Sequence, residues 1–177
     1  LPPLAPAEVQ AQGQVSGNPT APALNVGGVV NAASFARDAA VSPGAIVSVF
    51  GRNLARGSNI ASRLPLETIL GGATLNVGGV DAPLFFAGNG QINAQLPFDL
   101  APNSRPHVAV RTGRDGSVAE AITVPETITI AATQPGIFTT NQQGTGQGAI
   151  LDTQGRVVDR AAPAAIGEVV QVFCTGL

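Results

Sequence analysis

The sequence lacks several residue types, and each absence narrows the classes of protein to which it can belong. Its 177 residues include no Lys, Met, Trp or Tyr and only one Cys. A single cysteine excludes an internal disulfide and a multi-cysteine metal site, so stability must come from the core or from assembly. The nine basic residues are all Arg and are scattered rather than clustered. With no basic stripe and no Trp or Tyr to stack bases, we expect no nucleic acid partner.

Long apolar runs are also missing, because Gly, Pro, Asn or Arg interrupts each hydrophobic segment. We therefore expect no membrane span, since a helix that crosses a bilayer needs a long uninterrupted apolar stretch. The sequence does not begin with Met, and we expect that a secretory signal peptide has been removed. This expectation places the protein outside the cell or on the cell surface.

What the sequence does contain is typical of a folded β protein with many turns. It has 22 Gly and 14 Pro, while 44% of its residues are hydrophobic and only 11% are charged. A chain of this composition can bury enough apolar surface to offset its ordering entropy. From residue 25 onward, short apolar or alternating runs are separated by Gly, Pro, Asn and Asp, which predicts an all-β sandwich. Residues 63–70 are the best candidate for a short turn of helix.

The same pattern divides the chain into three predicted parts. Residues 1–24 contain five prolines and no sustained periodicity, and we expect them to form an extended tail. Residues 25–133 are predicted to form the β-sandwich. Residues 134–177 are predicted to form a partial second β unit.

Two segments are candidate strands with a special role. The first is residues 8–12, where Val9 and Ala11 mark a candidate tail strand that could add to a sheet edge. The second is residues 91–96, which alternate strictly between polar and apolar side chains, as a strand with one buried face does, and whose apolar members are predicted to face the core. Its amides could bind a sugar or the backbone of another strand, or could form only a solvated polar face. This candidate polar binding face consists of Gln91, Asn93 and Gln95.

The most informative pattern is an internal repeat. Residues 43–54 reappear as residues 166–177 with constant spacing. In the first copy, the sequence continues into the other strands of a sandwich, whereas no strands follow the second copy. We therefore expect an orphan C-terminal strand, meaning a strand without sheet neighbours in its own chain. The corresponding pairs are Gly44 and Gly167, Val47 and Val170, Val49 and Val172, Phe50 and Phe173, and Leu54 and Leu177.

An exposed orphan strand is unfavourable, because each buried aliphatic side chain contributes about 1.5–3 kcal/mol. The strand could pack on its own domain, continue into a further domain, or insert into a sheet of a neighbouring subunit. The last alternative is β-augmentation, and repeated head to tail it generates a fibre. The candidate inter-subunit strand consists of Val169, Val170, Val172 and Phe173.

Several short segments together carry a family resemblance, although each is weak alone. They are residues 30–35, 43–54, 82–86, 90–97, 135–138, 146–151 and 167–177. With these residues the chain resembles the tandem immunoglobulin-like domains at the C-termini of secreted proteins of Solibacter and related Acidobacteria, which are similar to the TIG fold. The resemblance implies an immunoglobulin-like β-sandwich and export, and it carries no catalytic signature.

Chemical motifs are scarce. His107 is the only histidine, and no nucleophile motif or positioned partner accompanies it. The loop acids do not match a calcium loop, and the Gly-rich segments lack the Lys of a phosphate loop. We therefore expect no enzymatic activity, no metal site and no cofactor. Because aromatic residues are few, we expect Phe85, Phe86 and Phe98 in the core.

These observations leave three alternatives for the function. The first is an extracellular structural subunit that polymerises with copies of itself, with residues 168–177 or the tail as the strand donor and an open groove as the acceptor. The second is an adhesion or carbohydrate-binding module of a larger secreted protein, with surface glycans as partners. A third alternative, an enzyme, would depend on His107 as the only available base.

Overall fold

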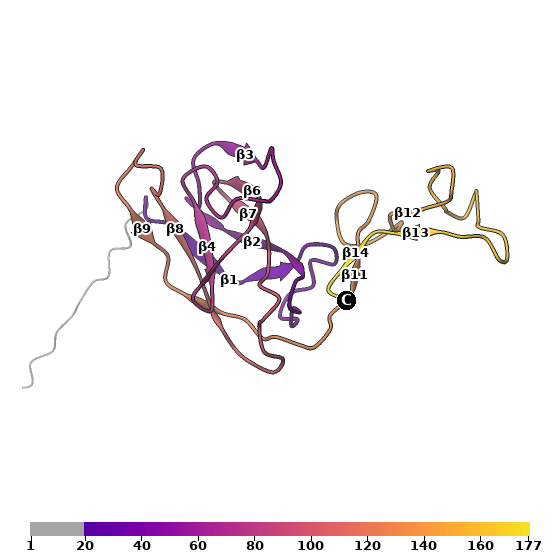
Figure 1. Cartoon of the computed structure of the whole chain (residues 1–177), viewed down its shortest axis with the longest axis horizontal. Coiled ribbons are helices and arrows are strands. Elements are labelled where there is room, and N and C mark those ends of the chain that lie inside the picture. The colour runs from indigo at the N-terminus through magenta and orange to yellow at the C-terminus, as the bar shows by residue number, and fades with distance from the viewer. Residues whose placement is uncertain (1–19) are drawn as a thin grey trace, which may run out of the picture.

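The structure consists of β-strands joined by turns and loops. The computed structural model describes residues 20–177, and in that range every regular element is a strand. The larger strands form two sheets in a sandwich-like arrangement (Figure 1). The all-β prediction is confirmed, but the helical turn expected at residues 63–70 is wrong. There the backbone carbonyl of Glu67 accepts a hydrogen bond from the Leu84 N–H at 2.8 Å, so the backbone of the segment bonds to a neighbouring strand.

The first sheet has five antiparallel strands. β2 lies in its interior, where Val49 is opposite Val29 on one side and Ile92 on the other. β1 contains a bulge, because its register on β2 shifts between Leu24 and Val29. In spatial order the strands are β1 (Ala23–Asn31), β2 (Ile46–Arg52), β7 (Gln91–Gln95), β6 (Leu84–Gly88) and β3 (Ser58–Ile60).

The second sheet contains a tight hairpin between β4 and β5. Gly78 and Gly79 both have positive φ, at 59° and 96°, which tight hairpin turns require. The Gly79 N–H donates to Oδ1 of Asn76 at 3.0 Å and holds the turn. In spatial order the strands are β10 (Glu126–Thr127), β8 (His107–Thr112), β4 (Thr74–Val77) and β5 (Val80–Ala82), and β9 (Ala121–Ile122) also pairs with β8.

The core between the two sheets is made of aliphatic side chains. Alternate residues of the central strands point inward, so that Val47 and Val49 of β2 and Ile92 of β7 are fully buried. This burial confirms the core face that was predicted for β7. Every buried hydrophobic residue of the described chain lies between Val29 and Ile130. The segment after residue 133 therefore adds no residue to this core.

None of the seven Phe residues belongs to the buried core, so the expectation for Phe85, Phe86 and Phe98 is wrong. Phe98 is 77% exposed, and the other two are half-buried. A register irregularity between Leu84 and Phe86 interrupts the alternation of β6. The inward positions are filled by Val, Leu, Ile and Ala, and closely packed interiors leave no space for additional rings.

Residues 134–177 form a smaller unit, which we call the C-terminal arm. It projects from one end of the sandwich (Figure 1). Two hydrogen bonds fix its base: Nδ2 of Asn31 donates to the Gln134 carbonyl at 3.0 Å, and the Ile46 N–H donates to Oγ1 of Thr175 at 2.8 Å. The arm contains β11 (Gly136–Ile137) paired with β14 (Cys174–Thr175), and β12 (Ile150–Leu151) paired with β13 (Gln171–Val172).

The terminal segment is therefore not without partners in its own chain, and the expectation of an orphan strand is corrected. Residues 136–138 and 149–151 lie along one edge of residues 171–175, because the hairpin of residues 139–148 interrupts the partner strand. The sequence repeat identified the strand but not this distant partner. The division of the chain at residues 24/25 and 133/134 stays a prediction, since two short ladders do not define an independent folding unit.

The core assignment predicts a clear difference between two substitutions. Leu75→Ala removes a fully buried side chain of β4 and should lower the free energy of unfolding by about 2–5 kcal/mol. Ile122→Ala removes a 57% exposed side chain of β9, and we expect a change within about 0.5 kcal/mol. Urea unfolding followed by circular dichroism measures both, because the chain has no Trp or Tyr for fluorescence. Equal effects of the two substitutions would contradict the assigned core.

Candidate functional site

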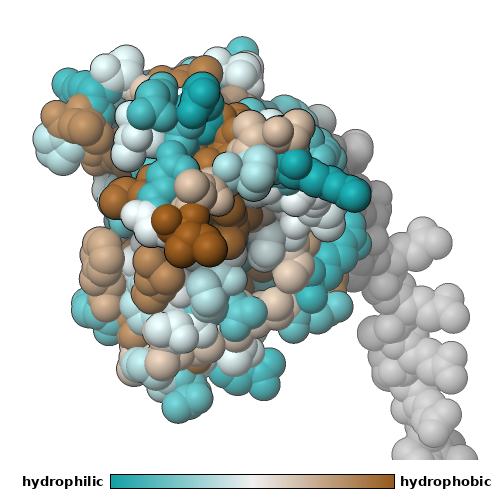
Figure 2. Space-filling view, turned by 90° about the vertical axis from the view of Figure 1, so that its right-hand side faces the viewer, coloured by the Kyte–Doolittle hydropathy of each residue, from teal (hydrophilic) through white to brown (hydrophobic). Residues whose placement is uncertain are grey.

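An apolar strip on the arm is the first candidate surface. Its side chains are 38–71% exposed, whereas Val47 and Val49, which correspond to two of them in the first copy of the repeat, are fully buried. Figure 2 views the molecule from the side of the arm and shows hydrophobic side chains reaching the surface there. Four residues define this terminal strip: Val169, Val170, Val172 and Phe173.

The pairing of β12 with β13 repeats the pairing of β1 with β2. On β2, Val49 is opposite Val29 and Ser48 is opposite Val30. On β13, the corresponding Val172 is opposite Ile150 and Gln171 is opposite Leu151. The repeat therefore extends from sequence to strand pairing, and β12 takes the place of β1.

The other edge of β13 is open in the part of the chain that the structure describes. On β2, the Ala45 carbonyl and the Gly51 N–H form hydrogen bonds with the residues that flank β7. The backbone groups of every second residue from Ala45 to Gly51 therefore point toward β7. The Ile46 carbonyl bonds on the β1 side. In the arm, the Phe173 N–H likewise donates to Ala149, on the β12 side. By the same alternation, the backbone groups of residues 170 and 172 face the edge where no strand is present among residues 20–177.

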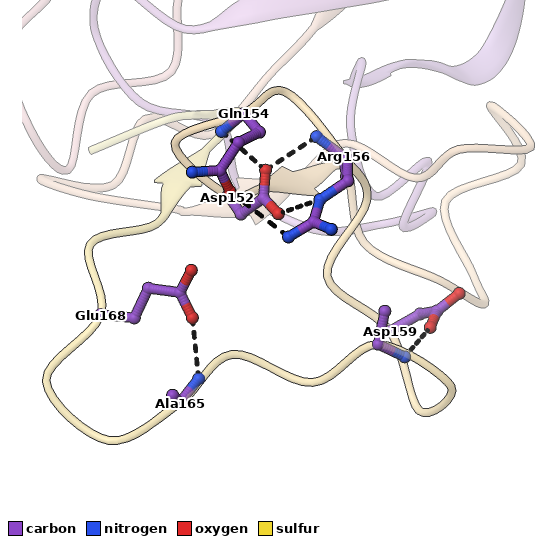
Figure 3. Close-up of polar contacts among 7 residues, drawn as sticks. Asp152, Gln154, Arg156, Asp159, Ala165 and Glu168 are labelled. Atoms are coloured by element: carbon purple, nitrogen blue, oxygen red, sulfur yellow. Dashed lines mark hydrogen bonds and ion pairs between the residues drawn. The ribbon is translucent and has the colours of Figure 1, made fainter.

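Polar contacts hold the long connection between β12 and β13 (Figure 3). Oδ1 of Asp152 accepts hydrogen bonds from the backbone N–H groups of Gln154 and Arg156, both at 2.9 Å, and Nε of Arg156 donates to its Oδ2 at 2.7 Å. Just before β13, Oε2 of Glu168 accepts a hydrogen bond from the Ala165 N–H at 2.8 Å. These contacts fix the turn that follows β12 and the approach to β13.

The Asp152 carboxylate is the electrostatic centre of this connection. The backbone N–H of Arg156 is the main cause that holds the pKa of Asp152 below its usual value, and the Arg156 side chain and the Gln154 N–H act in the same direction. Each of these donors stabilises the charged carboxylate. The turn is therefore best ordered when Asp152 is ionised.

A groove of about 850 Å³ between the first sheet and the arm is the second candidate surface. Its lining combines polar side chains with five of the seven Phe residues of the chain. The rings of Phe35 and Phe50 lie 6.3 Å apart at a tilt of 44°, within contact range for aromatic pairs. The aromatic residues of the groove are Phe35, Phe50, Phe85, Phe138 and Phe173.

The structure brings part of the predicted polar face into this groove. Gln91 and Asn93 line the groove, whereas Gln95 does not and instead donates to the Gly44 carbonyl at 3.2 Å. Oδ1 of Asn93 accepts hydrogen bonds from Nε2 of Gln91 at 2.7 Å and from Oγ of Ser48 at 3.1 Å. These contacts hold two amides beside the aromatic rings of the groove.

The remaining predicted residues lie elsewhere. Val9 and Ala11 fall outside the described residues. His107 is exposed on β8, where its Nδ1 lies 3.2 Å from Oγ1 of Thr127. Cys174 is half-buried in β14. Within residues 20–177 no three His, Cys, Asp or Glu side chains are grouped as metal ligands would be.

Sequence reasoning missed the aromatic side of the groove. Phe50 and Phe173 occupy the same position of the repeat, and this was the one signal that linked two of the rings. Phe138 and Phe173 reach the groove because the arm contacts the end of the first sheet. Contact between distant segments cannot be deduced from local alternation.

Comparison with known proteins identified no relative of this chain. No family model, curated protein or solved structure gave a significant match to the chain. The resemblance to the immunoglobulin-like domains of Acidobacteria therefore stays a hypothesis. Within the described residues, no helix has the length and apolar character of a membrane span.

The role assigned to Asp152 predicts a pH dependence of the arm. A lowered pKa means that the turn is stabilised above the usual aspartate pKa and loses this support as the pH falls through the lowered value. We expect the amide shifts of Gln154 and Arg156 in NMR spectra to titrate below the usual range, and Asp152→Asn should remove that transition. A midpoint at or above the usual aspartate value would contradict this role.

Proposed function

We propose that this protein is a non-enzymatic extracellular structural subunit that assembles into filaments by β-strand donation between neighbouring copies. The observation that carries the proposal is the terminal strip along β13 and its flanking residues. Its side chains are exposed, while the corresponding Val47 and Val49 are buried in the middle of a sheet. An apolar strand with one free edge favours pairing with another strand.

The arrangement of the molecule supports assembly in a line rather than a closed pair. The arm projects from one end of the sandwich, beside Asn31 and Ile46 (Figure 1). A donor that differs from its acceptor makes a heterologous contact, which generates an open filament unless the rotation closes a ring. The finer fold assignment, an immunoglobulin-like or TIG-like sandwich, belongs to this proposal as well and rests on the family resemblance.

The proposal predicts filaments that depend on the apolar face of β13. The double variant Val170→Asp, Val172→Asp places two charges in the proposed contact, and we expect electron microscopy to show no filaments. The matched control is Val124→Asp, because Val124 is 85% exposed in a loop away from β13. It should leave filaments intact. A wild-type protein that stays monomeric at every concentration would contradict the proposal.

A second candidate function is an adhesion or carbohydrate-binding module. The groove favours it, because sugars are commonly held by amide hydrogen bonds together with aromatic rings, and Gln91 and Asn93 stand beside Phe50 and Phe85. A groove built from the sheet and the arm would also be present in each subunit of a filament. The two functions are therefore compatible.

The groove offers an internal control for this second candidate. Removing the Asn93 amide by Asn93→Ala should weaken glycan binding about tenfold, the effect of one or two lost hydrogen bonds. Gln91→Ala should act in the same direction, whereas Gln95→Ala should have little effect because Gln95 lies outside the groove. Binding to a glycan array by the three variants measures this difference. Equal loss in all three, or no glycan bound by the wild type, would contradict a sugar site in the groove.

A further inference from the structure

We propose that residues 8–12 of a neighbouring copy form the strand that pairs with the open edge of β13, antiparallel and in the register that β7 has on β2. The inference rests on the proposed function and identifies both donor and acceptor. It depends on two independent observations. One is the pairing of β13, and the other is the sequence of the tail.

The acceptor edge is defined by comparison with β2. β2 has β1 on one side and β7 on the other, and β13 has β12 in the place of β1. Among residues 20–177, no strand takes the place of β7 beside β13. The missing neighbour of β13 should therefore resemble β7.

The tail contains a segment with the sequence pattern of β7. Residues 8–12 read Glu-Val-Gln-Ala-Gln, and β7 (Gln91–Gln95) reads Gln-Ile-Asn-Ala-Gln. Both have polar side chains at positions one, three and five, an aliphatic β-branched residue at position two, and Ala at position four. The last two residues are identical. Ala94 packs in the interior beside β2, so a small residue at this position fits a close neighbour.

The tail segment also satisfies the backbone requirement of a strand. Pro has no N–H and is poorly tolerated where a ladder hydrogen bond is needed. Residues 7–18 contain no Pro, although Pro6 precedes them and Pro19 follows them. Every residue of the segment can therefore both donate and accept hydrogen bonds. Prolines on both sides limit the length of strand that can form.

The register follows from the pairing of β7 with β2. There Asn93 is opposite Ser48, Ile92 is opposite Val49, and Ala94 is opposite Val47. Transferred to β13, the same pairing packs the apolar side chains of the tail against the valines of the terminal strip. The expected pairs are Gln12 with Val169, Ala11 with Val170, Gln10 with Gln171, Val9 with Val172 and Glu8 with Phe173.

The donor is assigned to a second copy because the two ends of the described chain lie apart. The described N-terminal residues lie beside β9, where Ala21 accepts a hydrogen bond from Asn53 at 3.2 Å. The arm joins the sandwich at Asn31 and Ile46, at the other end of β1 and β2 (Figure 1). A tail that leaves from the first end is placed to meet the arm of the next molecule in a line.

The experiment is disulfide trapping in the full chain with Cys174→Ser. Gln10→Cys and Gln171→Cys are placed in two separate preparations, which are then mixed and oxidised. The corresponding Ser48 and Asn93 form a side-chain hydrogen bond of 3.1 Å, so cysteines in this register lie close enough to form a disulfide. Each chain then has one thiol, and a disulfide dimer on a non-reducing gel must join two copies.

We expect the mixed dimer as the main product. The register control replaces Gln10→Cys by Gln14→Cys, which lies four residues away on the same side of an extended strand, and little dimer should form. Equal amounts of dimer from the cysteines at positions 10 and 14 would overturn the inference, because the tail would then contact β13 without a defined strand register. The double variant Gln10→Cys, Gln171→Cys in one chain tests the internal alternative. An internal disulfide with no mixed dimer would also overturn it.

A pair of tail variants separates this inference from the proposed function. Ala11→Asp puts a charge on the apolar side of the tail strand and should abolish filaments, whereas Gln10→Asp changes the polar side and should preserve them. Filaments that persist in Ala11→Asp, together with the absence of a mixed dimer in the trapping experiment, would overturn the tail as donor. The proposal that filaments form by strand donation would then still stand. Absence of filaments in the wild type would overturn the proposed function itself.

Discussion

The rest of the structure depends on one constraint: a β-strand inside a sheet needs a neighbour on each edge and cover for its apolar side chains. β2 meets this constraint, because it lies between β1 and β7 and buries Val47 and Val49 against the second sheet. β13 lies at the corresponding position of the second copy of the repeat and meets it only on one edge. The two copies of the repeat thus show the same strand in a complete and an incomplete environment. The difference between them is the physical basis of the proposed assembly.

The position of the arm gives this incomplete strand its accessibility. Hydrogen bonds from Asn31 and Ile46 fix the base of the arm, while β12 and β13 extend away from the sandwich (Figure 1). The same contact creates the groove, since the arm supplies Phe138 and Phe173 and the first sheet supplies the amides. The docking contact between arm and sheet therefore produces the groove, which would not exist in the isolated sandwich.

Local sequence patterns predicted the sandwich and its core strands well. Strict alternation places Ile92 in the core, and the repeat shows that β13 corresponds to β2. Patterns of this kind report which face of a strand is buried, and they do not report which distant strand lies beside it. The pairing of β13 with β12 and the register shift that breaks the alternation of β6 were therefore not foreseen. The same limit explains why the outward position of the Phe residues was not predicted.

The central claim is that the free edge of β13 acquires a strand on assembly, and hydrogen exchange of single amides tests it most directly. The backbone groups of Val170 and Val172 face this edge, whereas the Phe173 N–H is already bonded to Ala149 and serves as an internal reference. The account predicts that the Val170 and Val172 amides exchange quickly in dilute monomer and slowly in assembled protein, while Phe173 changes little. Fast exchange of the two valine amides in assembled protein would contradict it.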